Sequence, residues 1–182
     1  MIGRSADLAN PVHCIAEHGF AILHGVLTRF EVEALTDEFA RTLRQGKAGI
    51  RHALTNSRIS AVAHETRLLD MVRAILGEYA FPFRATLLNK SRETNWLITW
   101  HQDTALPLQE RRDISGWGPW SVKEGIIYAH APAIALNKVL ALRLHLDDST
   151  AANGPLRVLP GTHTLGVLTD VSIQQLATNI PR

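Results

Sequence analysis

The sequence lacks the features that are typical of disulfide-rich, membrane and secreted proteins. Its 182 residues include one cysteine, Cys14, which excludes a disulfide scaffold and fits a reducing, cytoplasmic setting. Arg143 and His145 interrupt the longest apolar stretch, so no segment approaches the roughly 20 apolar residues of a membrane span. Residues 1–10 contain no apolar run typical of a signal peptide. We therefore expect a cytoplasmic protein without a membrane partner.

The chain also lacks a strong excess of charge of either sign. Its 19 Lys and Arg residues face 17 Asp and Glu residues, which gives a formal net charge of +2. The densest basic spot, Arg111 and Arg112, is flanked by Glu110 and Asp113 and is typical of a solvated surface. Nucleic acid is therefore a disfavoured partner. Glycine-rich phosphate loops and the Gly-x-Ser-x-Gly motif are absent from the sequence.

Tryptophan, in contrast, is concentrated in one part of the chain. All four tryptophans lie within a window of 25 residues: Trp96, Trp100, Trp117 and Trp120. Two of them belong to the loop GWGPW (116–120), where exposed aromatic side chains are costly unless they pack against something. The loop is either a lid over a pocket or a packed connection. We expect a pocket in this window.

The expected elements run from helices to strands. Periodicity predicts helices over 11–18, 29–44 and 65–76, with a capping box formed by Thr28 and Glu31. The second helix is expected to bury one stripe, made of Phe30, Leu35, Phe39 and Leu43. Strands are predicted over 83–90, 95–100, 124–130, 137–147 and 155–160, before a polar, helical segment over 171–180.

This order favours an α+β, mainly β fold built on a sandwich or barrel. We expect a single domain over residues 1–182, with a helical part over about 8–80 and a strand-rich core over about 81–170.

Two copies of the motif His-x-Asp are candidates for a metal site: His101 with Asp103, and His145 with Asp147. Residues two apart on a strand point to the same side, so an imidazole and a carboxylate could bind one metal. With a second, distant histidine, such a pair makes the triad of non-haem Fe(II), although zinc could use the same ligands. Composition and spacing cannot choose between the copies, and the alternative for each is a hydrogen-bonded histidine at a strand end.

Three further side chains stand out by their positions. Arg143 alternates with leucines on a strand that looks central, and a charge facing inward there needs an acidic side chain or an acidic ligand. His130 is expected to be a buried strand residue with a satisfied ring. His163 follows a tight turn and is expected to cap local backbone groups.

Five segments, taken in order, resemble the phytanoyl-CoA dioxygenase family. They are TLLNK (86–90), NWLITWHQD (95–103), GWGPW (116–120), LRLHLDD (142–148) and NGPLRVLPGTH (153–163). The resemblance covers about residues 15 to 168 and is strongest between 84 and 166. It implies a double-stranded β-helix (a jelly-roll, cupin-like core) preceded by N-terminal helices.

The resemblance also implies an activity: hydroxylation of a small molecule with Fe(II), 2-oxoglutarate and O₂, and decarboxylation of 2-oxoglutarate to succinate. The family's His-x-Asp falls on His101 and Asp103, which become the expected metal ligands and catalytic residues. Arg143 and Thr86 occupy positions that contact 2-oxoglutarate in the family. Asp103 argues against the halogenating relatives, which replace this carboxylate.

The sequence departs from the family pattern at its C-terminal side. The family's third ligand is a histidine some 75 to 90 residues beyond His-x-Asp, followed by an arginine that pairs with 2-oxoglutarate, whereas no histidine follows His163 here. The last strands of the jelly roll are also expected to be missing. We expect a truncated piece of a longer protein, inactive or poorly active alone, rather than a degenerate chain that uses His145 or His163.

Two other function classes remain open. One is a catalytically inactive jelly-roll protein that keeps a pocket for a small ligand. The other is a zinc hydrolase on a cupin-like barrel, which would need a general base beside the metal. The substrate cannot be read from the sequence because loops such as 104–125 set specificity. Open sheet edges tend to pair with another chain, so a homo-oligomer is also open.

Overall fold

The computed structural model describes residues 11–43, 49–89, 98–150 and 155–178. The chain divides into two compact units. The first comprises Met1–Leu97 and Leu142–Val158, and the second comprises Ile98–Ala141 and Leu159–Arg182. Each unit has its own buried side chains, so each is described by itself.

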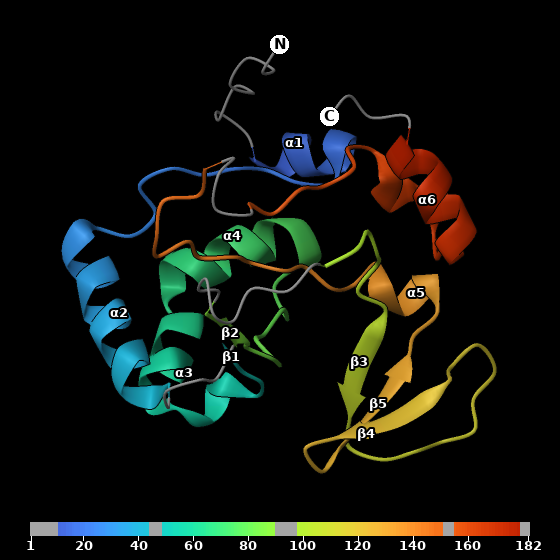
Figure 1. The fold of residues 1–182 in the computed structure, drawn as a ribbon, viewed down its shortest axis with the longest axis horizontal. Coiled ribbons are helices and arrows are strands. Elements are labelled where there is room, and N and C mark those ends of the chain that lie inside the picture. Colours follow the sequence, from blue (N-terminus) through green and yellow to red (C-terminus); the bar gives the residue numbers. More distant parts are fainter. Residues whose placement is uncertain (1–10, 44–48, 90–97, 151–154, 179–182) are drawn as a thin grey trace. The chain divides into compact units, whose positions relative to one another are not determined.

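The described part of the first unit is mainly helical (Figure 1). Its elements are α1 (Pro11–His18), α2 (Arg29–Thr42), β1 (Gly49–Ile50), the 3-10 helix η1 (Ala53–Thr55), α3 (Ser57–Ala63), α4 (Thr66–Leu76) and β2 (Leu87–Leu88). The helices predicted over 11–18, 29–44 and 65–76 are confirmed, each within two residues at either end. Helix α3 was not predicted. Its N-cap is Asn56, whose side chain accepts from two backbone N–H groups of the first turn.

The predicted capping box of α2 is confirmed. The Thr28 side chain accepts from the Glu31 N–H at 3.3 Å, and the Glu31 carboxylate accepts from the Thr28 N–H at 2.7 Å. The same carboxylate pairs with Arg67 of α4, which also donates to the Val26 carbonyl at 3.0 Å. Bonding to Arg67 and to Thr28 lowers the pKa of Glu31 to about 2. The start of α2 is therefore fixed to the start of α4.

Four small or branched side chains form the buried core of the first unit among the described residues: Leu35, Ala53, Ile59 and Leu68. The burial of Leu35 confirms part of the stripe expected on α2. The prediction for Phe30 is wrong, because its side chain is 79% exposed. The reason is geometric. Leu35 lies five positions after Phe30, a rotation of about 140° beyond one full helical turn, so the two side chains do not share a face.

Strands β1 and β2 form a short antiparallel pair, with Gly49 opposite Leu88 and Ile50 opposite Leu87. The two backbones approach closely. A Cβ atom on Gly49 would lie 2.3 Å from the carbonyl oxygen of Leu87. Only glycine fits this position without moving a strand.

The second unit is built around a three-stranded antiparallel sheet (Figure 1). Its elements are β3 (Ala105–Leu108), β4 (Trp120–Lys123), β5 (Ile126–His130), α5 (Ala133–Leu136), the 3-10 helix η3 (Thr162–Leu165) and α6 (Asp170–Thr178). Strand β5 lies between β3 and β4 and carries Tyr128 and Ala129, which are both buried. Pro107 has no N–H to donate, and it lies on the edge strand β3, where none is needed.

The observed strands differ from several predicted ones. The segment 124–130 contains β5, and the segment 83–90 contains only the two residues of β2. No strand is found over 137–147 or over the described residues 98–100 and 155–160. Alternation over 140–147 shows which side chains could share a face, but a strand also needs a neighbour for its hydrogen bonds. Leu142 is 47% exposed. Residues 44, 90, 95–97, 153, 154, 179 and 180 of the predicted segments lie outside the described residues.

The protein is thus a mixed helical and sheet structure with small antiparallel sheets. The helical prediction for the C-terminal segment is confirmed by α6. Within the described ranges, no helix combines the length and apolar character that a membrane crossing requires.

Candidate metal site

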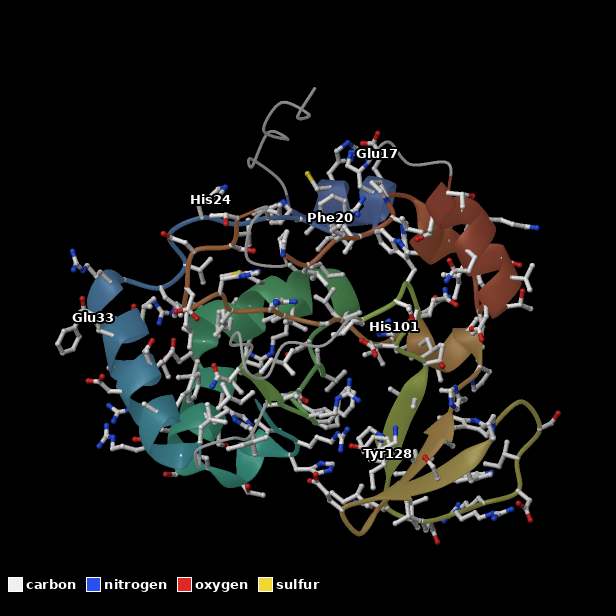
Figure 2. The ribbon with its side chains drawn as sticks, viewed as in Figure 1. Glu17, Phe20, His24, Glu33, His101 and Tyr128 are labelled. Carbon is white, nitrogen blue, oxygen red and sulfur yellow. The ribbon has the colours of Figure 1, made fainter. Side chains whose placement is uncertain are left out.

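The motif His101-Gln102-Asp103 lies directly before β3 in the second unit, where Figure 2 labels His101. We expected it at the end of a strand, and it instead leads into one. Backbone pairing begins at the next residue, because the Ala131 N–H donates to the Thr104 carbonyl at 2.9 Å. The motif is therefore tied at its C-terminal side to the end of β5.

The imidazole of His101 is hydrogen-bonded to the backbone of Thr99. Its Nδ1 lies 2.7 Å from the carbonyl oxygen of Thr99. A carbonyl oxygen only accepts, so Nδ1 must carry the proton. In the neutral ring, the lone pair is then on Nε2, which is the atom that can bind a metal.

That Nε2 faces the carboxylate of Asp103. The distance from Nε2 to Oδ1 is 3.8 Å, and the side chains are 52% and 85% exposed. Two donor atoms about 2.1 Å from an octahedral ion, at right angles to each other, lie roughly 3 Å apart. A shift of about 1 Å would therefore let both atoms bind one divalent cation. The pair fits as two of the ligands of such an ion.

The second His-x-Asp motif differs in this respect. His145 and Asp147 belong to the first unit and are exposed, as His101 and Asp103 are, but no ion pair joins them in the part of the chain that the structure describes. The spacing of the two motifs is the same. The two motifs differ in the described structure in this approach of His101 to Asp103, and the assignment of metal ligands stays a prediction.

Residues Gln102 and Thr104 make contacts that the sequence analysis missed. The carboxamide of Gln102 donates to the Gly166 carbonyl at 2.9 Å and accepts from the Leu168 N–H at 2.7 Å. The Thr104 hydroxyl lies 2.6 Å from Nδ1 of His130 at the end of β5. His130 is exposed, not buried as predicted, although its ring is hydrogen-bonded as predicted. No local sequence pattern predicts these contacts, because the partners lie 26 to 66 residues away along the chain.

The tryptophan-rich loop reaches the same end of β5. Gly118 N–H donates to the His130 carbonyl at 2.9 Å, and His130 N–H donates to the Pro119 carbonyl at 3.2 Å. Trp117 and Trp120 are half-buried. These bonds support the packed-connection interpretation of the loop. Its role as a lid stays a prediction.

The two residues predicted to contact 2-oxoglutarate belong to the first unit, whereas His101 and Asp103 belong to the second. Thr86 directly precedes β2 and is exposed. Arg143 is also exposed and lies outside any described strand, so the expectation of an inward-facing charge is wrong. That expectation depended on a strand over 140–147, and these residues form no strand. The role of either residue stays a prediction.

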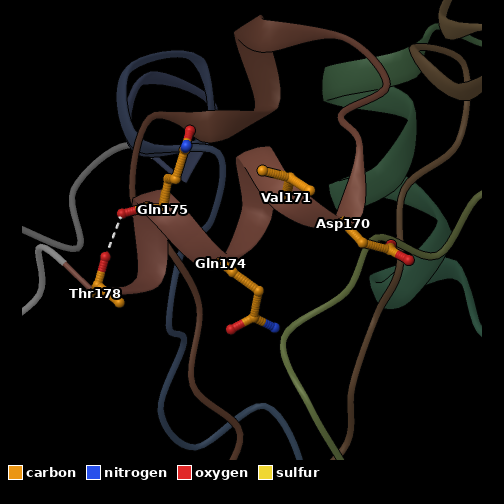
Figure 3. A pocket seen from close by; sticks show the side chains of 5 residues that line it. All are labelled: Asp170, Val171, Gln174, Gln175 and Thr178. Carbon is orange, nitrogen blue, oxygen red and sulfur yellow. Dashed lines mark hydrogen bonds between the residues drawn. The ribbon is translucent and has the colours of Figure 1, made fainter.

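A complete set of metal ligands is not assembled among the described residues. No group of three or more His, Cys, Asp or Glu side chains is arranged there to hold a metal ion. A pocket is found on one helix of the second unit instead. Figure 3 shows the five lining side chains, all from α6: Asp170, Val171, Gln174, Gln175 and Thr178. None of them is a predicted site residue, and Val171 is 67% exposed, so this shallow hollow does not mark the metal site.

The described structure is that of a mixed helical and sheet protein in which a histidine and a carboxylate, His101 and Asp103, approach each other at the surface. The sequence model of one family, phytanoyl-CoA dioxygenase (PhyH), matches residues 15–171. The chain therefore belongs to the phytanoyl-CoA dioxygenase family, whose members are in general Fe(II)/2-oxoglutarate-dependent dioxygenases. The resemblance found in the sequence is confirmed. Searches among curated proteins and among solved structures give no match.

Proposed function

We propose that the chain is a non-haem Fe(II)/2-oxoglutarate-dependent dioxygenase that hydroxylates a small molecule. In this proposal, Nε2 of His101 and the carboxylate of Asp103 are two of the iron ligands. The observation that carries it is the bond from Nδ1–H of His101 to the Thr99 carbonyl. It leaves the Nε2 lone pair available at 3.8 Å from Asp103.

The donor chemistry favours iron over other uses of the pair. A mixed nitrogen and oxygen set that leaves positions open is typical of Fe(II) oxygenases, in which the open positions bind the cosubstrate and oxygen. When bound, iron would supply the oxidation chemistry that removes CO₂ from 2-oxoglutarate and hydroxylates the substrate. The residues of this chain contribute the orientation of one imidazole and one charged carboxylate. Exposure of both side chains leaves them accessible to further ligands.

Finer features of the proposal come from family membership. The sheet β3–β5–β4 is taken as part of a double-stranded β-helix core. Thr86 and Arg143 keep the roles in binding 2-oxoglutarate that the resemblance gives them. The identity of the small-molecule substrate is left open.

An anaerobic titration tests the proposal. The purified chain is titrated with Fe(II) and then with 2-oxoglutarate, while the visible charge-transfer band of the iron chelate is recorded. We expect a band in the wild-type protein and its loss in His101→Ala. The matched control is His145→Ala, which removes the histidine of the second His-x-Asp motif and should keep the band. Absence of the band in the wild type, or an equal band in His101→Ala, would overturn the proposal.

A further inference from the structure

The four residues 101–104 use their side chains in two alternating ways. His101 and Asp103 are exposed, with their functional atoms close together. Gln102 and Thr104 are less exposed and hydrogen-bond to other segments of the second unit. The odd positions are thus available for a ligand, and the even positions are anchored.

The anchor at Gln102 uses both ends of its carboxamide. Nε2 donates to the Gly166 carbonyl, and Oε1 accepts from the Leu168 N–H. The distances of 2.9 and 2.7 Å are those of good hydrogen bonds. Two bonds to one planar amide fix its rotation as well as its position. The side chain therefore joins the motif to a segment 64 to 66 residues further along the chain.

The segment that receives this amide depends on a glycine. Gly166 ends η3 with φ 70° and ψ −152°, a combination that is essentially restricted to glycine. A Cβ atom there would meet Ala133 at 3.8 Å, an ordinary contact, so space is not the constraint. The backbone conformation is the constraint. It aims the Gly166 carbonyl at Gln102, and any other residue would be strained there.

We propose that Gln102 is a positioning residue for the His101–Asp103 pair, acting through its two bonds to the backbone of residues 166 and 168. The inference rests on the proposed function, because it concerns the same metal pair. The backbone on either side of Gln102 carries the two ligand side chains, so fixing residue 102 orders both before metal arrives. A site that is ordered in advance loses less conformational entropy on binding. By linkage, a bound metal must in turn stabilise the contact with residues 166 and 168.

The contact can be removed from either side. Gln102→Leu deletes both hydrogen-bonding groups at similar volume, and Gly166→Ala disturbs the backbone that accepts them. Each should weaken Fe(II) binding, measured anaerobically by equilibrium titration, by about 10- to 100-fold, the usual effect of losing a partner that orients a metal ligand. Two controls match these variants. Gln109→Leu removes an exposed glutamine just beyond β3, and Gly125→Ala places a side chain on another glycine of positive φ with open space around it. Both should bind within twofold of the wild type.

A second measurement needs no variant and separates positioning from a merely structural role. Amide hydrogen exchange at Leu168 should slow about tenfold when saturating Fe(II) is added, in line with the reciprocal coupling. A structural bond indifferent to the metal would exchange at the same rate with and without it. In His101→Ala, which keeps Gln102 but loses a ligand, Fe(II) should leave the Leu168 rate unchanged.

The outcomes distinguish the two proposals. If the wild type fails to bind Fe(II), the proposed function fails. If the wild type binds, His101→Ala does not, and Gln102→Leu and Gly166→Ala bind as the wild type does, the positioning role alone is overturned. A Leu168 exchange rate that Fe(II) does not change in the wild type would overturn it as well.

Discussion

Replacing Asn56 by alanine should destabilise the first unit, because this side chain joins two helices. Its Oδ1 accepts from the N–H groups of Arg58 and Ile59 at 3.0 and 3.2 Å, which caps α3. Its Nδ2 donates to the Glu38 carboxylate on α2 at 3.3 Å. Loss of such a cap costs about 1 kcal/mol. The long bond to Glu38 adds roughly 0.5 kcal/mol.

We therefore expect Asn56→Ala to lose about 1.5 kcal/mol of unfolding free energy, which lowers Tm by roughly 3–6 °C in a chain of this size. Asn56→Ser keeps the cap and loses the long bonds from Nδ2 to Glu38 and Thr42, so it should lose about 0.5 kcal/mol. Urea unfolding followed by circular dichroism at 222 nm reports on the helices. Equal losses in the two variants would refute the cap as the main contribution.

Three further changes have defined outcomes. Because the pKa of Glu31 is lowered to about 2 in the folded chain from an ordinary value of 4.5, the stability due to its bonds with Arg67 and Thr28 is complete above pH 4.5 and is lost as the pH falls towards 2. Glu31→Gln should flatten the unfolding free energy over that range, and an unchanged pH profile would contradict the assignment. Gly49→Ala should lower the unfolding free energy by about 1–3 kcal/mol, because the new side chain pushes β1 away from β2. Amide exchange in both strands should become faster, and protection equal to that of the wild type would argue against a close approach of the two backbones. Tyr128→Ala removes a side chain that is only 4% exposed and should lower the unfolding free energy of the second unit by about 3–5 kcal/mol. Urea unfolding followed by tryptophan fluorescence measures this loss, and a loss below about 1 kcal/mol would be inconsistent with the burial of Tyr128.

Features encoded within a few residues were predictable from the sequence. The capping box of Thr28 and Glu31 is one example, since both partners lie within one helical turn. Helix α3 was missed, although Asn56 before an apolar segment was a readable N-cap signal. Strand β3 lies within 104–125, a segment expected to be a loop, and Pro107 is acceptable in it because β3 is an edge strand.

Long-range pairing was not predictable in the same way. Alternating leucines over 140–147 met every local criterion for a strand, yet no neighbouring strand pairs with them within the described ranges. The candidate site was likewise predictable in its local features and not in its long-range contacts. Spacing brought His101 and Asp103 together as candidates, and the fold supplied what spacing could not: the orientation of the ring and the partners of Gln102, more than 60 residues away.

The most direct test of the central claim is anaerobic equilibrium binding of Fe(II) by the chain, compared between the wild type, His101→Ala and His145→Ala. The account predicts binding by the wild type and by His145→Ala, and none above background by His101→Ala. No Fe(II) binding by the wild type, or equal binding by His101→Ala, would contradict it.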